Sequence, residues 1–337
     1  MTVAPPSSGW PSRVLIVGPA WVGDMVMAQS LFAALKEMHP RVEIDVLAPR
    51  WTLPLLHFMP EVRRAIAQLL GHGELRLATR YRLAKELREP GYDLALVLPG
   101  SLKAALIPLW ASIRERRGYG GALRRLLLTD ARTKPKLPQV ESYVALADWP
   151  GEPPRPRLTL PPGASGQALD ALGLARPATP LLAIAPGAEY GPAKRWPSRH
   201  FAAVAAARRA QGWQVWLFGS TADREIAAEI PCDQNLTGRT SLDQAVALLG
   251  LADAVLSNDS GLMHIAAALD RPQVALFGPS DPLRTGPRNP AAQVLRLGLE
   301  CSPCNQRVCP LGHHRCLEDL LPESVLAALP RAESKSP

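Results

Sequence analysis

Three turns in the chain combine glycine with charged or polar side chains, a composition suited to binding phosphates and sugars. The first, residues 18–24 (GPAWVGD), follows a short apolar run and precedes a helical pattern. Its two glycines allow backbone N–H groups to face an anion or a sugar. Asp24 falls near the start of the predicted helix, where a carboxylate serves either as an N-cap or as a catalytic group. The G-x4-G spacing differs from the GxGxxG of dinucleotide-binding proteins.

The second turn, residues 186–197 (PGAEYGPAKRWP), places two bases before a predicted helix. Lys194 and Arg195, together with the amides of that helix, would form a clamp for a pyrophosphate. The alternative is that both are solvated surface bases. The turn lacks the G-x4-GK[ST] spacing and is therefore not a P-loop.

The third turn, residues 257–264 (SNDSGLMH), again joins a strand pattern to a helix pattern. Asn258, Asp259, Ser260 and His264 could bind sugar hydroxyls while the helix N-terminus faces a phosphate. The alternative is a capped helix with a core histidine. Weaker candidates follow or adjoin other predicted strand ends: Gly219, Ser220, residues 237–241 with Thr240, and residues 277–280.

A fourth constellation is Cys301-x2-Cys304-x4-Cys309-x6-Cys316, with His313 and His314 inside it. Three interpretations remain open: a structural metal site, reduced thiols, or a redox pair. A closed four-thiolate site would be structural, because a catalytic zinc keeps one position open.

The fifth is a basic segment, residues 114–136, with eight Lys and Arg residues against Glu115 and Asp130. It is either a solvated charged face or a surface for anionic lipid headgroups or a phosphorylated glycan. Tyr119 is its only aromatic residue, which argues against nucleic-acid stacking.

Alternating strand and helix patterns position these turns. Apolar or alternating runs predict strands at 13–17, 42–47, 93–98, 181–185, 214–218, 254–257 and 273–277. Helical spacing predicts helices at 25–38, around 83–87, and at 200–210, 242–251, 264–269 and 322–329. The alternation predicts α/β domains with parallel sheets, and the turns then lie at the carboxyl ends of strands.

A change of composition divides the chain. The first domain is predicted at 1–165, a Pro- and Gly-rich linker at 166–180, the second domain at 181–320, and a helix and tail at 321–337. Two such halves are expected to enclose a central cleft.

Composition excludes several classes. With 337 residues, 47% hydrophobic and 20% charged, the chain can bury a sizeable core, which excludes disorder. The net charge of +8 favours an anionic partner. No run of 18 apolar residues and no secretory signal is visible, so we expect a cytosolic protein whose cysteines are not disulfide-bonded.

Together, residues 18–31, 186–197 and 258–269 resemble the ADP-heptose:lipopolysaccharide heptosyltransferases, glycosyltransferase family 9, most closely the heptosyltransferase II group. Residues 70–75 (LGHGEL), 93–101 (DLALVLPGS) and 214–220 (QVWLFGS) add to the resemblance in the same order.

The resemblance implies a GT-B fold, two Rossmann-like domains facing a central cleft, with the last helix packing back on the first domain. It also implies inverting transfer of L-glycero-D-manno-heptose from ADP-heptose to the first heptose of the inner core, carried on Kdo–lipid A. Catalysis would need no metal or other cofactor, and no DxD motif stands in a matching place. The enzyme would work at the inner face of the inner membrane, and the basic segment would dock on that anionic leaflet.

The resemblance also assigns roles. Asp24 matches the general base, and Lys194 matches the cation that stabilises the departing ADP. Asp259 matches the carboxylate on the donor heptose. Further donor contacts would be Gly187, Glu189, Arg195, Gly219, Ser220, Thr240, Ser260, Gly261 and His264. Acceptor contacts would be Trp21, Gly23, Asp24, Arg117 and Arg124.

Rival interpretations make different predictions. Within the class, heptosyltransferase I or another sugar-nucleotide transferase is possible. A nicotinamide oxidoreductase requires GxGxxG and an acidic residue at the end of the second strand, where only Asp45, inside that strand, is available. A nucleic-acid-binding protein requires a basic stripe interleaved with aromatics.

Overall fold

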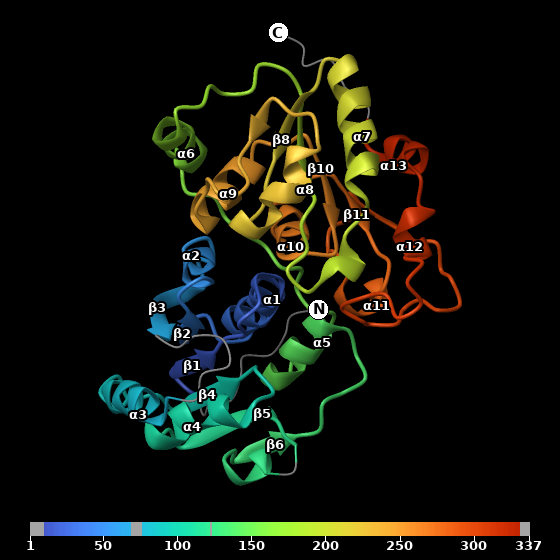
Figure 1. The fold of residues 1–337 in the computed structure, drawn as a ribbon. Coiled ribbons are helices and arrows are strands. Elements are labelled where there is room, and N and C mark those ends of the chain that lie inside the picture. The colour runs from blue at the N-terminus through green and yellow to red at the C-terminus, as the bar shows by residue number, and fades with distance from the viewer. Residues whose placement is uncertain (1–9, 69–75, 122, 331–337) are drawn as a thin grey trace. The chain divides into compact units, whose positions relative to one another are not determined.

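The computed structural model describes residues 10–68, 76–121 and 123–330, and the chain divides into two units after Pro156. Each unit consists of a parallel six-stranded sheet with helices on its faces (Figure 1). The α/β class predicted from the alternating patterns is therefore confirmed.

The sheet of unit 1 has the strand order β3-β2-β1-β4-β5-β6. Its central strands are continuous apolar runs, as expected for strands covered on both faces. The strands are β1 (Arg13–Val17), β2 (Glu43–Pro49), β3 (Val62–Gln68), β4 (Leu94–Val97), β5 (Glu115–Tyr119) and β6 (Asp130–Arg132).

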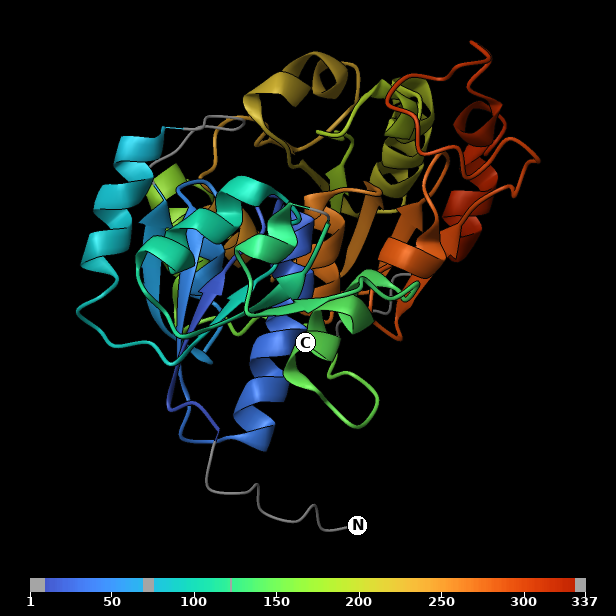
Figure 2. The ribbon, with the colours of Figure 1, turned by 90° about the horizontal axis from the view of Figure 1, so that it is seen from below.

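Helices cover both faces of this sheet. Leu15 and Val17 share a core with α3 and α4, so by the two-residue period of a strand Val14 and Ile16 face the opposite side. Helices α1 and α5 lie side by side (Figures 1 and 2). The helices are α1 (Val22–Met38), α2 (Leu53–Leu56), α3 (Leu77–Glu86), α4 (Leu102–Trp110) and α5 (Gln139–Val144), with 3-10 turns at Arg124–Leu126 and Ala145–Ala147.

The sheet of unit 2 repeats the same topology, with the order β12-β11-β10-β7-β8-β9. Each pair of neighbouring strands is parallel. The strands are β7 (Leu181–Ala185), β8 (Gln214–Leu217), β9 (Gln234–Asn235), β10 (Ala254–Asn258), β11 (Gln273–Leu276) and β12 (Ala292–Leu295).

Its main core joins the sheet to α7 and to the C-terminal helices. Leu182 and Ile184 pack with Phe201 and Val204 of α7, and with Val325 of α13. Helices α7 and α13 are neighbours in Figure 1. The helices are α6 (Ala164–Leu172), α7 (Ser198–Ala210), α8 (Arg224–Ala228), α9 (Leu242–Leu249), α10 (Gly261–Ala268), α11 (Pro282–Thr285), α12 (Arg315–Glu318) and α13 (Pro322–Ala328), with 3-10 turns at Pro192–Lys194 and Thr221–Asp223.

Both sheets have the 3-2-1-4-5-6 order of a Rossmann fold. The chain direction across the sheet reverses between β1 and β4 in unit 1, and between β7 and β10 in unit 2. Ligands of open α/β sheets bind outside the carboxyl ends of the strands at such a switch point. The turns after β1, β7 and β10 are the three turns singled out in the sequence.

The boundary between the units differs from the predicted one. It falls after Pro156 instead of after residue 165, and the predicted linker contains most of α6. The reason is that this segment bonds to unit 2: the Leu158 N–H donates to the Ala268 carbonyl at 2.8 Å, and Ser165 Oγ donates to the Ala247 carbonyl at 2.7 Å. The last helix, which the resemblance placed on the first domain, contributes Val325 to the unit 2 core.

In the described part of the chain, no helix combines the length and the apolar character needed to cross a membrane.

Candidate active site

An ion pair between Lys194 and Asp259 lies at the switch point of unit 2. Lys194 ends the 3-10 turn after β7, and Asp259 follows the last residue of β10. Lys194 Nζ donates to Asp259 Oδ2, and Ser280 Oγ donates to the same oxygen at 2.5 Å. Asp259 is only 7% exposed, so its charge is stabilised mainly by these two partners. The structure thus brings two predicted residues together with Ser280, from the weaker candidate turn after β11.

Asn258 fixes the loop that carries Lys194. Its side chain is fully buried at the end of β10. Oδ1 accepts the Trp196 N–H at 3.0 Å, and Nδ2 donates to the Pro186 carbonyl at 2.7 Å. These bonds hold the two ends of the 186–197 loop. The indole of Trp196, also fully buried, donates to the Leu320 carbonyl at 2.8 Å and anchors the loop to the core.

The Lys194 ammonium also faces an aromatic ring. Its Nζ lies 4.9 Å from the centroid of the Tyr190 ring, and the guanidinium of Arg307 lies 5.2 Å from the same centroid. Cation–π contact of this kind stabilises a charge that is partly removed from water. Two cations beside one ring form a locally positive surface that attracts an anion.

The N-terminus of α10 presents a hydroxyl without a partner. Ser260 occupies the N-cap position, but its side chain makes no capping hydrogen bond. Its Oγ is buried and unpaired. A buried hydroxyl normally finds a partner, so this one suits a bound ligand. Gly261 begins the helix, where free N–H groups and the helix dipole favour an anion.

His264 faces the ion pair from the first turns of α10. Burial lowers the pKa of its imidazole to about 4. The charge of Asp259 raises this pKa, and the charge of Lys194 lowers it. The ring is therefore neutral at neutral pH and offers a hydrogen-bonding nitrogen without adding charge. The interpretation of His264 as a buried histidine is therefore confirmed, and its ring also borders the polar cluster.

A carboxylate that the sequence did not single out organises the neighbouring turn. Ser220 N–H and Oγ both donate to Asp223 Oδ2 at 2.8 Å. A Cβ on Gly187 would lie 2.2 Å from Asp223 Oδ1, so only glycine fits there. Arg195 Nη2 lies 4.0 Å from the same carboxylate.

The predicted donor residues form two groups in unit 2: one surrounds Asp223, and the other is the Lys194–Asp259 cluster. Gly187, Arg195, Gly219 and Ser220 surround Asp223. Glu189 is exposed, and Thr240 is partly buried before α9. The hydrogen bonds that define the Lys194–Asp259 cluster do not involve these two residues.

In unit 1, Asp24 lies within the first turn of α1, which starts at Val22. The N-cap is Trp21, so the capping interpretation of Asp24 is wrong. Tyr143 of α5 donates its hydroxyl to Asp24 Oδ1 at 3.3 Å. Burial, and then the negative charge of Asp24, raise the pKa of Tyr143 well above its ordinary value, so the phenol remains a donor. The Trp21 side chain is 39% exposed, and Gly23 is partly buried.

Gly18 has a packing role. Its N–H donates to the Leu47 carbonyl at 2.8 Å, so it is not available to an anion. A Cβ there would lie 2.6 Å from Met25 Cε.

The carboxylate of Asp45 is fully buried and engaged in hydrogen bonds. It accepts from Arg63 Nε at 2.9 Å and from the Tyr92 hydroxyl at 2.6 Å. It therefore cannot serve a nucleotide ribose.

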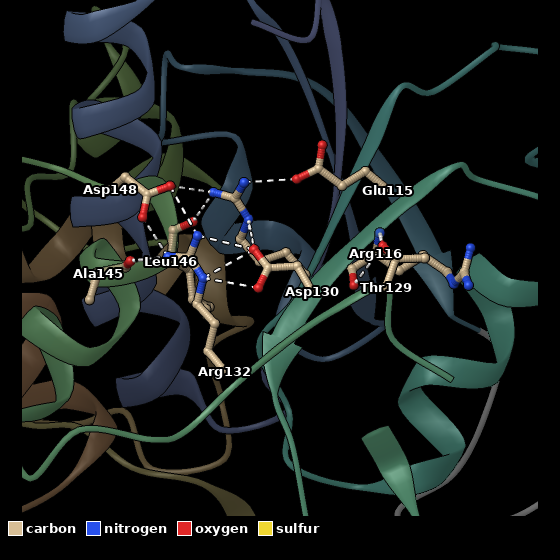
Figure 3. Close-up of polar contacts among 9 residues, drawn as sticks. Glu115, Arg116, Thr129, Asp130, Arg132, Ala145, Leu146 and Asp148 are labelled. Carbon is tan, nitrogen blue, oxygen red and sulfur yellow. Dashed lines mark hydrogen bonds and ion pairs between the residues drawn. The ribbon is translucent and has the colours of Figure 1, made fainter. Parts of the chain in front are cut away.

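The basic segment is not the exposed surface that we expected. Arg117 is 9% exposed and Arg124 is 3% exposed. The guanidinium of Arg117 contacts Glu115 at 2.7 Å and Asp148 at 2.8 Å. Figure 3 shows the polar network of Glu115, Asp130, Arg132 and Asp148. Arg132 bonds the same Asp148 and lowers the pKa of its carboxyl.

Arg124 is equally occupied. It donates to the backbone carbonyls of Val97, at 3.0 Å, and Tyr119. The expectation of a continuous basic face fails at Arg117 and Arg124, because both are paired inside unit 1. We therefore do not assign Arg117 and Arg124 to the acceptor site. The motif at residues 70–75 lies outside the described residues.

The sequence and fold are similar to those of known glycosyltransferases. Residues 80–315 match glycosyltransferase family 9 (heptosyltransferase). The chain is 44% identical to lipopolysaccharide heptosyltransferase 2 of Salmonella typhimurium, over 94% of this chain and 97% of the relative. It is 27% identical to lipopolysaccharide heptosyltransferase 1 of Pseudomonas aeruginosa, over 93% of each. The solved structure of Escherichia coli ADP-heptose lipopolysaccharide heptosyltransferase II, 41% identical, superposes with a TM-score of 0.83 over 94% of this chain and 97% of the other.

These findings define an enzyme of the glycosyltransferase class, with the GT-B fold of two Rossmann-like units. The chain belongs to glycosyltransferase family 9, the heptosyltransferases. The oxidoreductase and nucleic-acid-binding interpretations are thereby set aside.

The buried imidazole of His264 predicts a pH dependence of stability. Its folded pKa of about 4 lies below the ordinary 6.5, so between these values only the unfolded chain binds the proton. The free energy of unfolding therefore falls as the pH drops through this window, by about 3 kcal/mol for this group. His264→Gln should remove that part of the pH dependence in urea unfolding of unit 2.

His57→Gln, at an exposed position in unit 1, is the matched control for the substitution itself. If the unfolding free energies of wild type and His264→Gln change by the same amount between pH 7 and pH 4, that result would contradict the buried neutral imidazole.

Proposed function

We propose that this enzyme is a lipopolysaccharide heptosyltransferase 2, which transfers L-glycero-D-manno-heptose from ADP-heptose to the first heptose of the inner core. The observation that carries the proposal is the Lys194–Asp259 pair at the switch point of unit 2. The higher identity to a type 2 relative than to a type 1 relative favours this acceptor over the heptose-free one.

Unit 2 would hold the donor. The Lys194 ammonium and the N-terminus of α10 offer positive charge for the diphosphate. Asp259 accepts hydrogen bonds and would bind heptose hydroxyls, with Ser260 Oγ as a further partner. Neutral His264 adds polarity without repelling Lys194. The cluster therefore separates a cationic part for phosphate from a polar part for sugar.

Unit 1 would supply the base. The acceptor hydroxyl oxygen attacks the anomeric carbon of the donor heptose, and its proton passes to the Asp24 carboxylate. The bond between that carbon and the diphosphate oxygen breaks, and ADP leaves with the electron pair. Inversion at the anomeric carbon follows from a single displacement. Tyr143 donates to Asp24 Oδ1, which helps to orient the carboxylate for proton transfer.

Lys194 would stabilise the leaving group. As the carbon–oxygen bond breaks, negative charge grows on the diphosphate, and a cation already in place needs little reorganisation. Asn258 and buried Trp196 hold this loop before the donor arrives. We propose that this fixed cation replaces a catalytic metal ion.

The test is release of ADP from ADP-heptose, in the presence of EDTA, with two acceptors. We expect release with the core acceptor that carries one heptose and little with the heptose-free Kdo–lipid A. Release with the heptose-free acceptor alone would move the assignment to heptosyltransferase 1. Dependence on an added divalent ion would contradict the role given to Lys194.

Two substitutions test the residue roles in the same assay. Asp24→Asn should lower kcat by about 10²–10⁴, because a general base contributes that much. Lys194→Ala should lower kcat by about 10²–10³, the effect of losing one preorganised charge-stabilising group. Lys85→Ala is a matched control, since Lys85 Nζ also lies over a tyrosine ring, 5.1 Å from the centroid of Tyr81. Equal effects of the two lysine substitutions would overturn the assignment.

The lipid-anchored acceptor implies a membrane contact, and two exposed leucines support the position that we propose for it. Leu123 is 70% exposed and Leu126 is 79% exposed, with the exposed Arg125 between them. We propose that this short segment docks on the anionic inner leaflet, since apolar side chains beside a base favour such an interface.

Arg125→Glu combined with Leu126→Ala should weaken binding to vesicles containing anionic lipid by several-fold in a flotation assay. The control is Arg114→Glu, which makes the same charge change at an exposed position of the basic segment and lacks the flanking leucines. Vesicle binding that is unchanged in the double variant would contradict this contact.

A further inference from the structure

One arginine from the segment before α12 approaches the loop that carries Lys194. This segment, the cysteine loop, comprises residues 296–314 between β12 and α12, and Arg307 lies within it. The Arg307 carbonyl accepts the Ala193 N–H at 3.0 Å. A Cβ on Gly191 would lie 2.5 Å from that carbonyl oxygen and 3.1 Å from the Arg307 Cα, so only glycine leaves room for the arginine backbone. The glycine of the predicted pyrophosphate-binding turn therefore allows Arg307 to approach.

Further hydrogen bonds tie the cysteine loop to the active-site turns. In the part of the chain that the structure describes, no three metal-binding side chains are grouped to hold an ion, those of this loop included. The Tyr190 hydroxyl donates to the Asn305 carbonyl at 2.8 Å, and the Asn305 N–H donates to the Pro279 carbonyl at 2.7 Å. Pro279 directly precedes Ser280, which bonds to Asp259. The backbone near Arg307 is thus held against two turns of the candidate active site.

The Arg307 side chain lies beside the ring that also faces Lys194. Its guanidinium lies 5.2 Å from the centroid of the Tyr190 ring, and Lys194 Nζ lies 4.9 Å from the same centroid. Lys194 has Asp259 as its counterion. Across residues 10–68, 76–121 and 123–330, no carboxylate forms an ion pair with Arg307. Two cations beside one ring repel each other, and an anion bound next to them would relieve that repulsion.

We propose that Arg307 is a second donor-binding cation, which contacts the diphosphate of ADP-heptose beside Lys194. The inference rests on the proposed function, because that function supplies the diphosphate. A guanidinium binds phosphate oxygens in a bidentate manner, whereas an ammonium acts as a point charge. The two side chains therefore combine a fixed orientation of the diphosphate with neutralisation of its charge. Negative charge that grows on the departing ADP is then shared between two cations that are already in place.

The first test is calorimetric titration of the full chain with ADP at increasing concentrations of sodium chloride. Arg307→Gln should weaken ADP binding about tenfold, the effect of losing hydrogen bonds to a charged group, and should make the affinity less sensitive to salt. The substitution keeps the backbone carbonyl that accepts the Ala193 N–H, so we expect the fold to persist, and thermal unfolding checks this.

Arg296→Gln is the matched control, because it makes the same charge change at an exposed position of the same loop. It should bind ADP as the wild type does. Unchanged ADP affinity in Arg307→Gln, or equal weakening in both glutamine variants, would overturn the role of Arg307 and leave it a solvated surface base.

Inorganic pyrophosphate is a second probe, which separates this inference from the proposed function. It carries the diphosphate but neither the nucleoside nor the heptose. Pyrophosphate binding that depends on Arg307, in an enzyme that releases no ADP from ADP-heptose, would support the cationic pair and contradict the proposed function. ADP release that is the same in wild type and Arg307→Gln, with equal ADP affinity, would support the function and overturn the second cation. A wild type that binds neither ADP nor pyrophosphate would overturn both.

Discussion

The ion pair between Lys194 and Asp259 is the constraint around which unit 2 is arranged. Its partners are far apart in sequence and meet because β7 and β10 are adjacent parallel strands whose carboxyl ends coincide. Neighbouring residues serve this contact: Asn258 holds the loop of the lysine, and Ser280 holds the carboxylate. This largely buried pair of a cation and an anion is the site that we propose for a ligand that carries phosphate and hydroxyl groups.

The same topology in unit 1 explains why one chain can hold two chemical roles. The turn after β1 occupies the place that the Lys194 loop occupies after β7, and it begins the helix that carries Asp24. There a phenol, Tyr143, donates to the carboxylate. In the proposed mechanism, unit 1 supplies the base and unit 2 supplies the cation for the leaving group.

The sequence patterns predicted the strands and turns that depend on residues close together in the chain. Strands β1 and β7 were predicted to the residue, because continuous apolar runs end at glycine or proline. The polar turns were also predicted, because glycine next to charged residues can be recognised from the sequence alone. Ser280 was recognised only as part of a weaker candidate turn. Tyr143 and Asp223 were missed, because their contacts with Asp24 and Arg195 join residues distant in sequence. The basic segment was misread for the same reason: β5 carries Arg117 into the interior, where Asp148 neutralises it.

In the proposed mechanism, Lys194 binds the diphosphate and Asp259 binds the sugar. Calorimetric titration of Asp259→Asn with ADP and with ADP-heptose tests it directly. If the account holds, ADP binds at least as tightly as in the wild type, because Lys194 loses a competing carboxylate. The affinity for ADP-heptose relative to ADP should fall about tenfold, the effect of losing hydrogen bonds to a charged group. Equal weakening for both ligands would contradict the account.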